Sequence, residues 1–261
     1  MSAHSPLVNV MTGAAEKAAR PLIRDFNEIM ALQSSTKPLD HFFKVAQDKA
    51  TQTIIEFLSQ ARPDFGIKSY NEMLKEPDFP SKSYWFITSV CGIKNYMHAF
   101  PTWAIQISCI ENDQAIACVV FNPILNESFI ANKGSGAYLN SHRLRTSKRK
   151  TLDHHVLIGD LPVSDPTKTE FKKHNSEIAK LTQKAIIART IGCPALTYCY
   201  VAAGRMDAAF GYIANKEVGL NAELFMTESG GFHHNDLTAP LKRILIGNDQ
   251  ILTPLKNHLA S

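Results

Sequence analysis

A run of strand-like segments in the middle of the chain constrains the fold most. Short stretches of apolar, β-branched and aromatic residues alternate with turn residues there, as in the strands of a sheet. These segments are residues 84–88, 103–111, 114–121, 126–131 and 136–139. Asn112-Asp113 is typical of a hairpin turn, and Asn122-Pro123 marks another turn. The spacing therefore predicts a sheet in the first half of the chain.

The second half of the chain alternates between strand and helix patterns. The expected strands are 155–160, 186–191, 206–212 and 243–247, and the expected helices are 168–183, 194–203, 219–229 and 248–259. Such alternation favours layered sheets with helices packed on them. Before the first sheet, apolar residues at helical spacing predict helices at 7–32 and 45–61, and the polar, proline-containing stretch 66–83 predicts a loop.

These patterns indicate the fold class α/β (α+β), with two halves packed as one unit. We expect an N-terminal α+β half at residues 1–145 and a C-terminal α/β half at 146–261, joined by the basic stretch 141–150. A hydrophobic content of 44% with 20% charged residues is ordinary for a globular protein and allows a sizeable core. The net charge of +4 permits anionic partners without requiring them.

Several features predict a cytoplasmic protein that does not enter a membrane. The five cysteines are an odd number without a close pairing pattern, which favours reduced thiols. Residues 1–20 lack the basic leader and apolar core of a signal peptide. No stretch of apolar residues is long enough to span a bilayer.

Searches for catalytic motifs by chemistry alone find little. The chain has no P-loop, no GxSxG and no cysteine pair at zinc spacing. The paired histidines at 154–155 and 233–234 would point apart on a strand, so neither pair is expected to chelate a metal. The stretch 84–108 is more suggestive, because a buried strand feeds a turn at Thr88–Gly92 and a segment that could open a helix. Catalytic groups often lie at such a place, yet this stretch contains no Asp or Glu.

Four sequence blocks, in one order, carry a resemblance to a known family. They are FNPILNESFIANKGSGAYLN (121–140), IGCPALTYCYVAAGRMDAAF (191–210), TESGG (227–231) and ILIGN (244–248). Together they resemble the inositol monophosphatase family, and most of all its bacterial extragenic-suppressor, SuhB-like branch. The resemblance implies a layered α/β/α/β/α sandwich and a homodimer.

The family's metal-binding signature falls on residues 85–96. The residues that frame it are similar here: Trp85, Gly92, Asn95, His98 and Pro101. The resemblance implies that two metal-binding aspartates have become Thr88 and Cys91, and that a water-activating threonine has become Ile93. The vestigial positions of this segment are therefore Thr88, Val90, Cys91, Gly92 and Ile93.

Other site positions follow from the same resemblance. Lys68 stands where the family has a metal-binding Glu, and Val218 stands where it has its last metal-binding Asp. Gly211 replaces a substrate-binding Glu, and Pro194 replaces an alanine that contacts substrate. Only Asp48 keeps the residue type of its position.

The implied loss of four carboxylates predicts a catalytically inactive pseudophosphatase with a binding or regulatory role and no cofactor. Mg²⁺ needs hard oxygen ligands, which Lys, Thr, Cys and Val do not replace. The alternative is an active Mg-dependent phosphatase on inositol or sugar monophosphates, with ligands recruited from Glu72 or Glu76. A different chemistry at Cys91 and Lys68 would need a base that we do not identify. A relic without a present role is the remaining alternative.

Two kinds of partner follow from these residues. The SuhB-like branch acts in transcription complexes through NusA and RNA polymerase, which implies a protein or RNA partner. The basic residues that could contact it are Arg143, Arg145, Lys148, Arg149 and Lys150, although without interleaved aromatics a solvated turn is the plainer interpretation. A phosphate-type anion could bind beside Lys68 and a helix that starts at Ile93, unless Lys68 pairs with Asp48 and closes the pocket.

Overall fold

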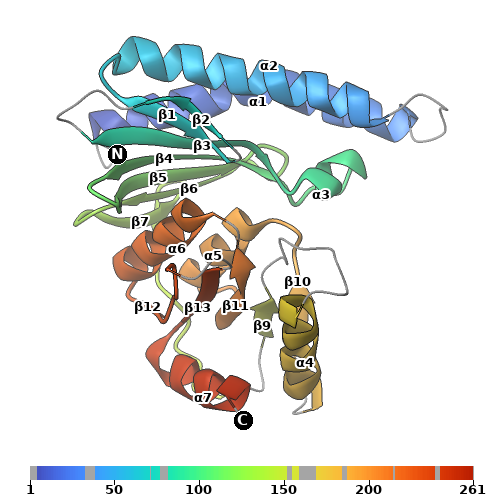
Figure 1. Cartoon of the computed structure of the whole chain (residues 1–261), viewed down its shortest axis with the longest axis vertical. Coiled ribbons are helices and arrows are strands. Elements are labelled where there is room, and N and C mark those ends of the chain that lie inside the picture. The colour runs from blue at the N-terminus through green and yellow to red at the C-terminus, as the bar shows by residue number, and fades with distance from the viewer. Residues whose placement is uncertain are drawn as a thin grey trace. The chain divides into compact units, whose positions relative to one another are not determined.

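The computed structural model describes residues 5–32, 39–70, 72–76, 82–151, 155–158, 169–183, 187–213, 215–238 and 242–260. The chain divides into two compact units, residues 1–142 and 143–261 (Figure 1). Each unit is built from one sheet and its covering helices, so the mixed α/β class is confirmed. Among the described residues, no helix has the length and apolar character to cross a membrane. All five cysteines are buried free thiols.

Two long helices cover one face of the first unit's sheet (Figure 1). They are α1 (Pro6–Leu32) and α2 (Leu39–Ala61). Helix α1 starts at a proline, which lacks the N–H that a first turn leaves unpaired. Its apolar residues at helical spacing, such as Met11, Leu22 and Ile29, are buried against the sheet as the sequence predicts. Helix α2 begins six residues before the expected residue 45.

The sheet of the first unit has eight strands in the order β2-β1-β3-β4-β5-β6-β7-β8. They are β1 (Gly66–Ser69), β2 (Met73–Lys75), β3 (Ser83–Cys91), β4 (Ala104–Glu111), β5 (Gln114–Asn122), β6 (Glu127–Asn132), β7 (Gly136–Leu139) and β8 (His142–Arg143). Strands β3 to β7 pair antiparallel, and β1 pairs parallel to β3. The predicted hairpin at Asn112-Asp113 is confirmed, and both residues have positive φ.

Two local predictions in this unit are wrong. The expected loop 66–83 contains β1, β2 and the start of β3, because strands of three or four residues are too short to show an apolar alternation. The expected turn at Thr88–Gly92 is mostly strand, since β3 continues to Cys91 with a register irregularity after Thr88. The turn itself is Gly92, at φ 88°, which leads into the five-residue helix α3 (Ile93–Met97).

The second unit has a five-stranded sheet in the order β10-β9-β11-β13-β12. Its strands are β9 (His155–Ile158), β10 (Ile187–Thr190), β11 (Ala208–Ile213), β12 (Phe232–His233) and β13 (Lys242–Gly247). Its helices are α4 (Thr169–Gln183), α5 (Pro194–Ala202), α6 (Lys216–Ser229) and α7 (Asp249–Ala260). The predicted alternation is confirmed, although residues 159–160 of the first expected strand lie outside the described residues. The two-residue strands β8 and β12 are too short to show a sequence pattern.

Strand β11 separates two different environments in this unit. Alternate residues of a strand point to opposite faces of the sheet. Phe210 packs with Leu245 and with Leu255 of α7, and its ring lies 5.5 Å from that of His174 on α4. Gly211, the next residue, lines a cavity against α5 on the other face. The sheet therefore carries helices on both faces, which is why the two faces can hold different chemistry.

Candidate functional site

A buried aromatic cluster supports the strand and turn where the sequence places the site. Trp85 on β3 is fully buried, and its ring lies 5.2 Å from that of Phe65. Tyr96 on α3 is also fully buried and meets Trp103 edge-to-face at 4.9 Å. The Tyr96 hydroxyl donates a hydrogen bond of 3.1 Å to the carbonyl of Leu22 on α1. This packing fixes both ends of the β3–α3 segment on the core.

Two asparagines fix the loop that follows α3. The Nδ2 group of Asn95 donates to the carbonyl of Thr102 at 2.7 Å and to its Oγ1 at 2.9 Å. The Nδ2 group of Asn122 donates to the carbonyl of Pro101 at 3.0 Å. Asn95 and Pro101 belong to the frame found in the sequence, whereas the part played by Asn122 was not foreseen. The frame residues thus have packing and hydrogen-bonding roles of their own.

The site positions on β3 have a different character. Thr88 is 8% exposed, and its Oγ1 has no hydrogen-bond partner. Lys68 lies opposite Phe86 in the parallel β1–β3 ladder, so Lys68 and Thr88 share one face of the sheet. Cys91 is buried farther along β3, beyond the register irregularity, and Ile93 is 39% exposed. The structure therefore places Lys68 and Thr88 on one face of the sheet, with Cys91 farther along β3, but Lys68 is not among the lining residues of the cavity beside Thr88.

A cavity of about 170 Å³ opens at this edge of the first unit. Its lining residues come from α2, β1, β3 and the segment after β1: Lys44, Gln47, Asp48, Thr51, Ser69, Tyr70, Glu72, Ile87, Thr88 and Ser89. Asp48 lies 3.7 Å from the Lys44 ammonium, and both side chains are largely exposed. Thr51 donates a hydrogen bond of 2.8 Å to the Ser89 hydroxyl. The cavity is polar, and hydroxyl groups are its commonest donors.

The residues of this cavity do not fit a magnesium ion. They offer two carboxylates, Asp48 and Glu72, and Asp48 already has the Lys44 ammonium beside it. Glu76 does not belong to the lining. Across the described part of the chain, no three His, Cys, Asp or Glu residues gather closely enough to hold a metal. Mg²⁺ is bound through one or two carboxylates together with waters, and here the Lys44 ammonium competes for one of the two, which makes this a poor ligand set.

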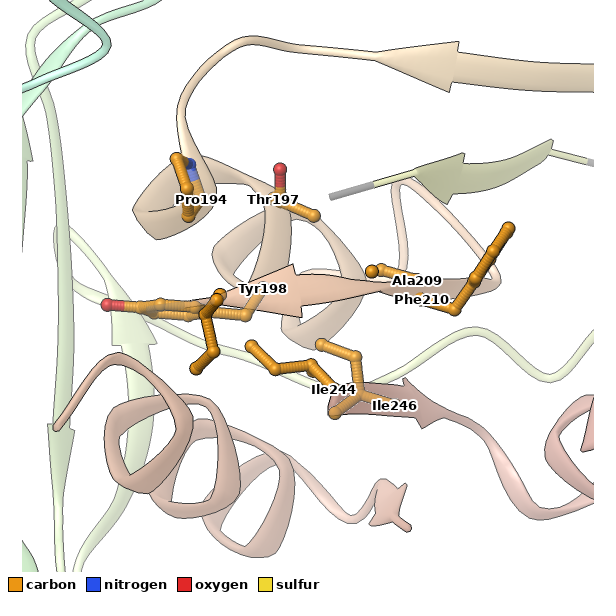
Figure 2. Close-up of a pocket in the computed structure, with 9 residues that line it drawn as sticks. Pro194, Thr197, Tyr198, Ala209, Phe210, Ile244 and Ile246 are labelled. Atoms are coloured by element: carbon orange, nitrogen blue, oxygen red, sulfur yellow. The ribbon is translucent and has the colours of Figure 1, made fainter. Parts of the chain in front are cut away.

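The substrate-side positions of the second unit line a much smaller cavity (Figure 2). Pro194 starts α5 and Gly211 lies on β11, and both face the same space together with Tyr198, Ile244 and Ile246. The volume is about 20 Å³, enough for a single water, whereas pockets for small molecules measure roughly 300–1,000 Å³. The lining is almost entirely apolar. In this structure the two positions line a small apolar pocket without room for a sugar.

Helix α6 carries Val218 and two polar residues that sequence reasoning did not single out. Val218 is 3% exposed, and its neighbour Glu217 is fully buried. Asn221, one turn farther on, is fully buried with neither amide atom hydrogen-bonded. Asn215 caps the helix by accepting a hydrogen bond from the Glu217 N–H at 3.1 Å. Buried polar side chains on the helix that carries Val218 give no signal in a sequence pattern, because burial decides their meaning.

Comparison with known proteins assigns the chain to a protein family. The chain belongs to the inositol monophosphatase family, whose sequence pattern matches residues 3–216. An inositol-1-monophosphatase of Caulobacter vibrioides is 36% identical over 224 residues, which cover 85% of this chain and 86% of that protein. The Nus factor SuhB of Xylella fastidiosa is 30% identical over 233 residues, covering 87% and 81%.

A solved structure confirms the same relationship in three dimensions. The extragenic suppressor protein SuhB of Bartonella henselae superimposes with a TM-score of 0.82 at 28% identity, covering 98% of this chain and 100% of that one. The match extends over both units of the chain. The family resemblance found in the four sequence blocks is therefore confirmed.

Proposed function

We propose that this chain is a non-hydrolysing member of the inositol monophosphatase family with a binding or regulatory role. The observation that carries the proposal is the polar cavity beside Thr88, where Asp48 and Glu72 are the only carboxylates among the described lining residues. By the family resemblance, the four metal carboxylates fall on Lys68, Thr88, Cys91 and Val218. The small apolar cavity at Pro194 and Gly211 supports the same interpretation.

The substitution at Lys68 has the largest electrostatic consequence. Two unit charges about 4 Å apart interact by about 4 kcal/mol at an effective dielectric constant of ~20, so a divalent ion facing an ammonium loses roughly twice that. It also loses the attraction of the carboxylate that the family places there. Since about 1.4 kcal/mol corresponds to a tenfold change in affinity, the loss spans many decades.

Phosphate-ester hydrolysis makes severe demands on a site without metals. The uncatalysed reaction is among the slowest known, and enzymes accelerate it by up to ~10²¹-fold. Metal ions supply much of this acceleration by activating water and stabilising the leaving oxygen. What the residues of this cavity can do is donate and accept hydrogen bonds through Thr51, Ser69 and Ser89 and attract charge through Lys44. That chemistry suits binding.

The test is magnesium titration by calorimetry together with a phosphatase assay on inositol 1-phosphate. The Caulobacter vibrioides relative, assayed in parallel, is the positive control. We expect no heat of magnesium binding and no phosphate release above background. Magnesium-dependent release at a rate comparable to the control would overturn the proposal.

The second candidate is a working Mg-dependent phosphatase. It is favoured by the name of the Caulobacter vibrioides relative, inositol-1-monophosphatase, and by two carboxylates near the site positions. Glu72 lines the cavity with Asp48, and Glu217 is fully buried next to Val218. If this candidate holds, Glu72→Gln or Glu217→Gln will abolish the activity, while Glu76→Gln will not.

Binding to a partner in a transcription complex is the proposed role that fits the name Nus factor SuhB, which several relatives carry. Within the basic stretch, Arg149 is committed internally, because it pairs with the buried Asp207 and donates to the carbonyl of Gly204. Arg145, Lys148 and Lys150 line a cavity of about 520 Å³ instead. Replacing these three with Ser should weaken binding to purified NusA or RNA, and unchanged binding would remove the stretch from the interface. The expected homodimer is testable by light scattering.

The phosphate-type anion beside Lys68 stays a prediction. Helix α3 has only five residues, so it offers no helix-dipole site, and binding would rest on Lys68 itself. The expected competitor for Lys68, Asp48, lies 3.7 Å from Lys44. Phosphate-induced shifts near Lys68 in NMR spectra, lost in Lys68→Ala, would support the anion.

A further inference from the structure

A second polar cavity lies on the α4 and α7 face of the second unit's sheet, away from Pro194 and Gly211. Its volume is about 440 Å³, within the size range of small-molecule sites. Its cationic residues are Lys173 of α4, Arg243 of β13 and Lys256 of α7. Tyr212 of β11 also lines it. We propose that this cavity binds a small dianion of the phosphate type. The proposal is independent of whether the chain hydrolyses phosphate esters.

The charges around the cavity favour an anion. Three cationic side chains line it, against one carboxylate, Asp236. That carboxylate is engaged locally, because its Oδ1 accepts hydrogen bonds from the Thr238 N–H at 3.1 Å and from the Thr238 hydroxyl at 2.8 Å. Among the described lining residues, positive charge therefore exceeds negative charge by two, which is the charge of a dianion. With the buried Glu177 behind the lining included, the excess is one, so the surroundings of the cavity remain positive. Charge interactions in such a space are stronger than in water.

A buried polar cluster behind the cavity is incomplete in its hydrogen bonds. Glu177 is 3% exposed, and its Oε1 accepts from Arg243 Nη2 at 3.0 Å and from the Tyr212 hydroxyl at 3.5 Å. Glu177 Oε2, Arg243 Nε and His174 Nδ1 are buried without a partner. Buried polar atoms are nearly always paired, so a cluster of unpaired ones points to a missing water or ligand. Because the Arg243 Nε–H is itself buried, an anion in the cavity would meet the part of the guanidinium that is exposed, since 30% of this side chain is accessible.

The cluster also holds the arginine in place. Tyr212 and Arg243 are direct neighbours in the β11–β13 ladder, and Glu177 bonds to both side chains. Asp236 and Arg243 exchange two backbone hydrogen bonds of 2.8 and 2.9 Å, which fix the loop beside β13. A guanidinium held by a buried carboxylate on one side presents its free edge with little loss of conformational freedom on binding. Glu177 is thus a positioning residue for Arg243.

His174 contributes no charge to this site at neutral pH. It is 1% exposed, and burial together with the charge of Arg243 lowers the pKa of His174 to about 4. Burial also raises the pKa of Glu177. The positive charge that an anion meets at pH 7 therefore comes from the two lysines and Arg243.

The experiment is a titration of the full chain with inorganic phosphate at low ionic strength. Calorimetry measures the binding, and NMR monitors the signal of the Arg243 Nε–H group. We expect that signal to shift on binding. The double variant Lys173→Gln with Lys256→Gln should bind phosphate at this site at least about tenfold more weakly, equivalent to about 1.4 kcal/mol. Both lysines are exposed, so their replacement should leave the fold intact.

The control matches the Lys173→Gln half of the double variant, because it removes one positive charge from the same helix, α4, without touching the cavity. Lys172 is an exposed neighbour of Lys173 on α4 that does not belong to the lining. The variant Lys172→Gln should bind phosphate as the unaltered chain does. The proposal is overturned if the Arg243 signal does not move with phosphate, or if the control and the double variant lose affinity equally. A Lys68→Ala variant in the same titration separates this site from the one expected in the first unit.

Discussion

Two sets of residues share the segment from β3 to the loop after α3, and they differ in how the protein uses them. The frame residues Trp85, Asn95 and Tyr96 are buried or hydrogen-bonded to other parts of the first unit. Of the site positions, Thr88 has a hydroxyl without a hydrogen-bond partner, and Ile93 has an exposed apolar side chain. The frame serves the fold, whereas Thr88 and Ile93 contribute little to it; among the other site positions, Val90 and Val218 are buried and do pack.

The difference indicates that the packing of this segment does not depend on the residues Thr88 and Ile93. A large buried ring contributes through apolar area, and this outweighs even the unpaired indole N–H groups of Trp85 and Trp103. A metal-binding carboxylate contributes little to packing, so its replacement leaves the fold standing. Four predictions test this separation, starting with the largest expected effect.

The first prediction concerns the buried frame. Trp85→Ala should lower the free energy of unfolding of the first unit by about 3–5 kcal/mol, because it removes a fully buried ring. Both tryptophans of the chain lie in this unit, so the fluorescence of Trp103 still reports its urea unfolding in the variant. The control is Phe100→Ala, since Phe100 is 54% exposed and its removal should cost under about 0.5 kcal/mol. Similar losses in both variants would contradict the comparison.

The second prediction restores the chemistry on the same frame. Together, Lys68→Glu, Thr88→Asp, Cys91→Asp, Ile93→Thr and Val218→Asp should produce magnesium binding in the millimolar range, equivalent to about 4 kcal/mol. Each single reversion should produce almost none, because residues that act as one unit are strongly non-additive. Calorimetry measures both. If one reversion alone gave most of the binding, our alignment of the site positions would be wrong.

Much of the fold was predictable because its signals are periodic. The long helix α1 and the hairpin at Asn112-Asp113 follow from apolar spacing and turn residues alone. Strands β1 and β2 were missed because a strand of three or four partly exposed residues has no alternation to detect. The continuation of β3 to Cys91 was missed because Thr and Ser suggest a turn, and only pairing with β4 makes them strand.

The candidate site positions came from the family resemblance alone, and their role stays a prediction. The resemblance pointed to Lys68, Thr88, Pro194 and Gly211, and the structure places each pair on one face or in one cavity within its unit. No periodic pattern distinguishes a buried charged residue from an exposed one on a helix. The cluster of Glu177 and Arg243 was therefore invisible until the chain was folded.

The third prediction concerns the hydrogen bonds of the frame. Asn95→Ala removes both bonds to Thr102, so the unfolding free energy of the first unit should fall by about 1–2 kcal/mol. Lys94→Ala, at the exposed position beside it, should change that free energy by less than about 0.5 kcal/mol. Urea unfolding monitored by tryptophan fluorescence compares the two. An Asn95 variant as stable as the Lys94 variant would show that this loop is not held by the frame.

The fourth prediction has the smallest effect and separates two neighbouring residues of β3. Thr88 Oγ1 is buried without a partner, whereas Ser89 Oγ accepts a hydrogen bond of 2.8 Å from Thr51. Thr88→Val keeps the side-chain shape and removes an unpaired hydroxyl, so the unfolding free energy should stay unchanged or rise by up to about 1 kcal/mol.

The matched variant Ser89→Ala should lose about 1 kcal/mol, because it removes the hydrogen bond between the Ser89 and Thr51 hydroxyls and leaves Thr51 Oγ1 with the Gln47 carbonyl alone. The same fluorescence-monitored unfolding resolves the sign of each change. A clear loss of stability in Thr88→Val would mean that this hydroxyl holds a water or a ligand in the folded protein. Thr88 would then take part in binding. The proposed separation between residues that serve the fold and site positions without a present role would not hold at this residue, where the resemblance implies the family's first aspartate.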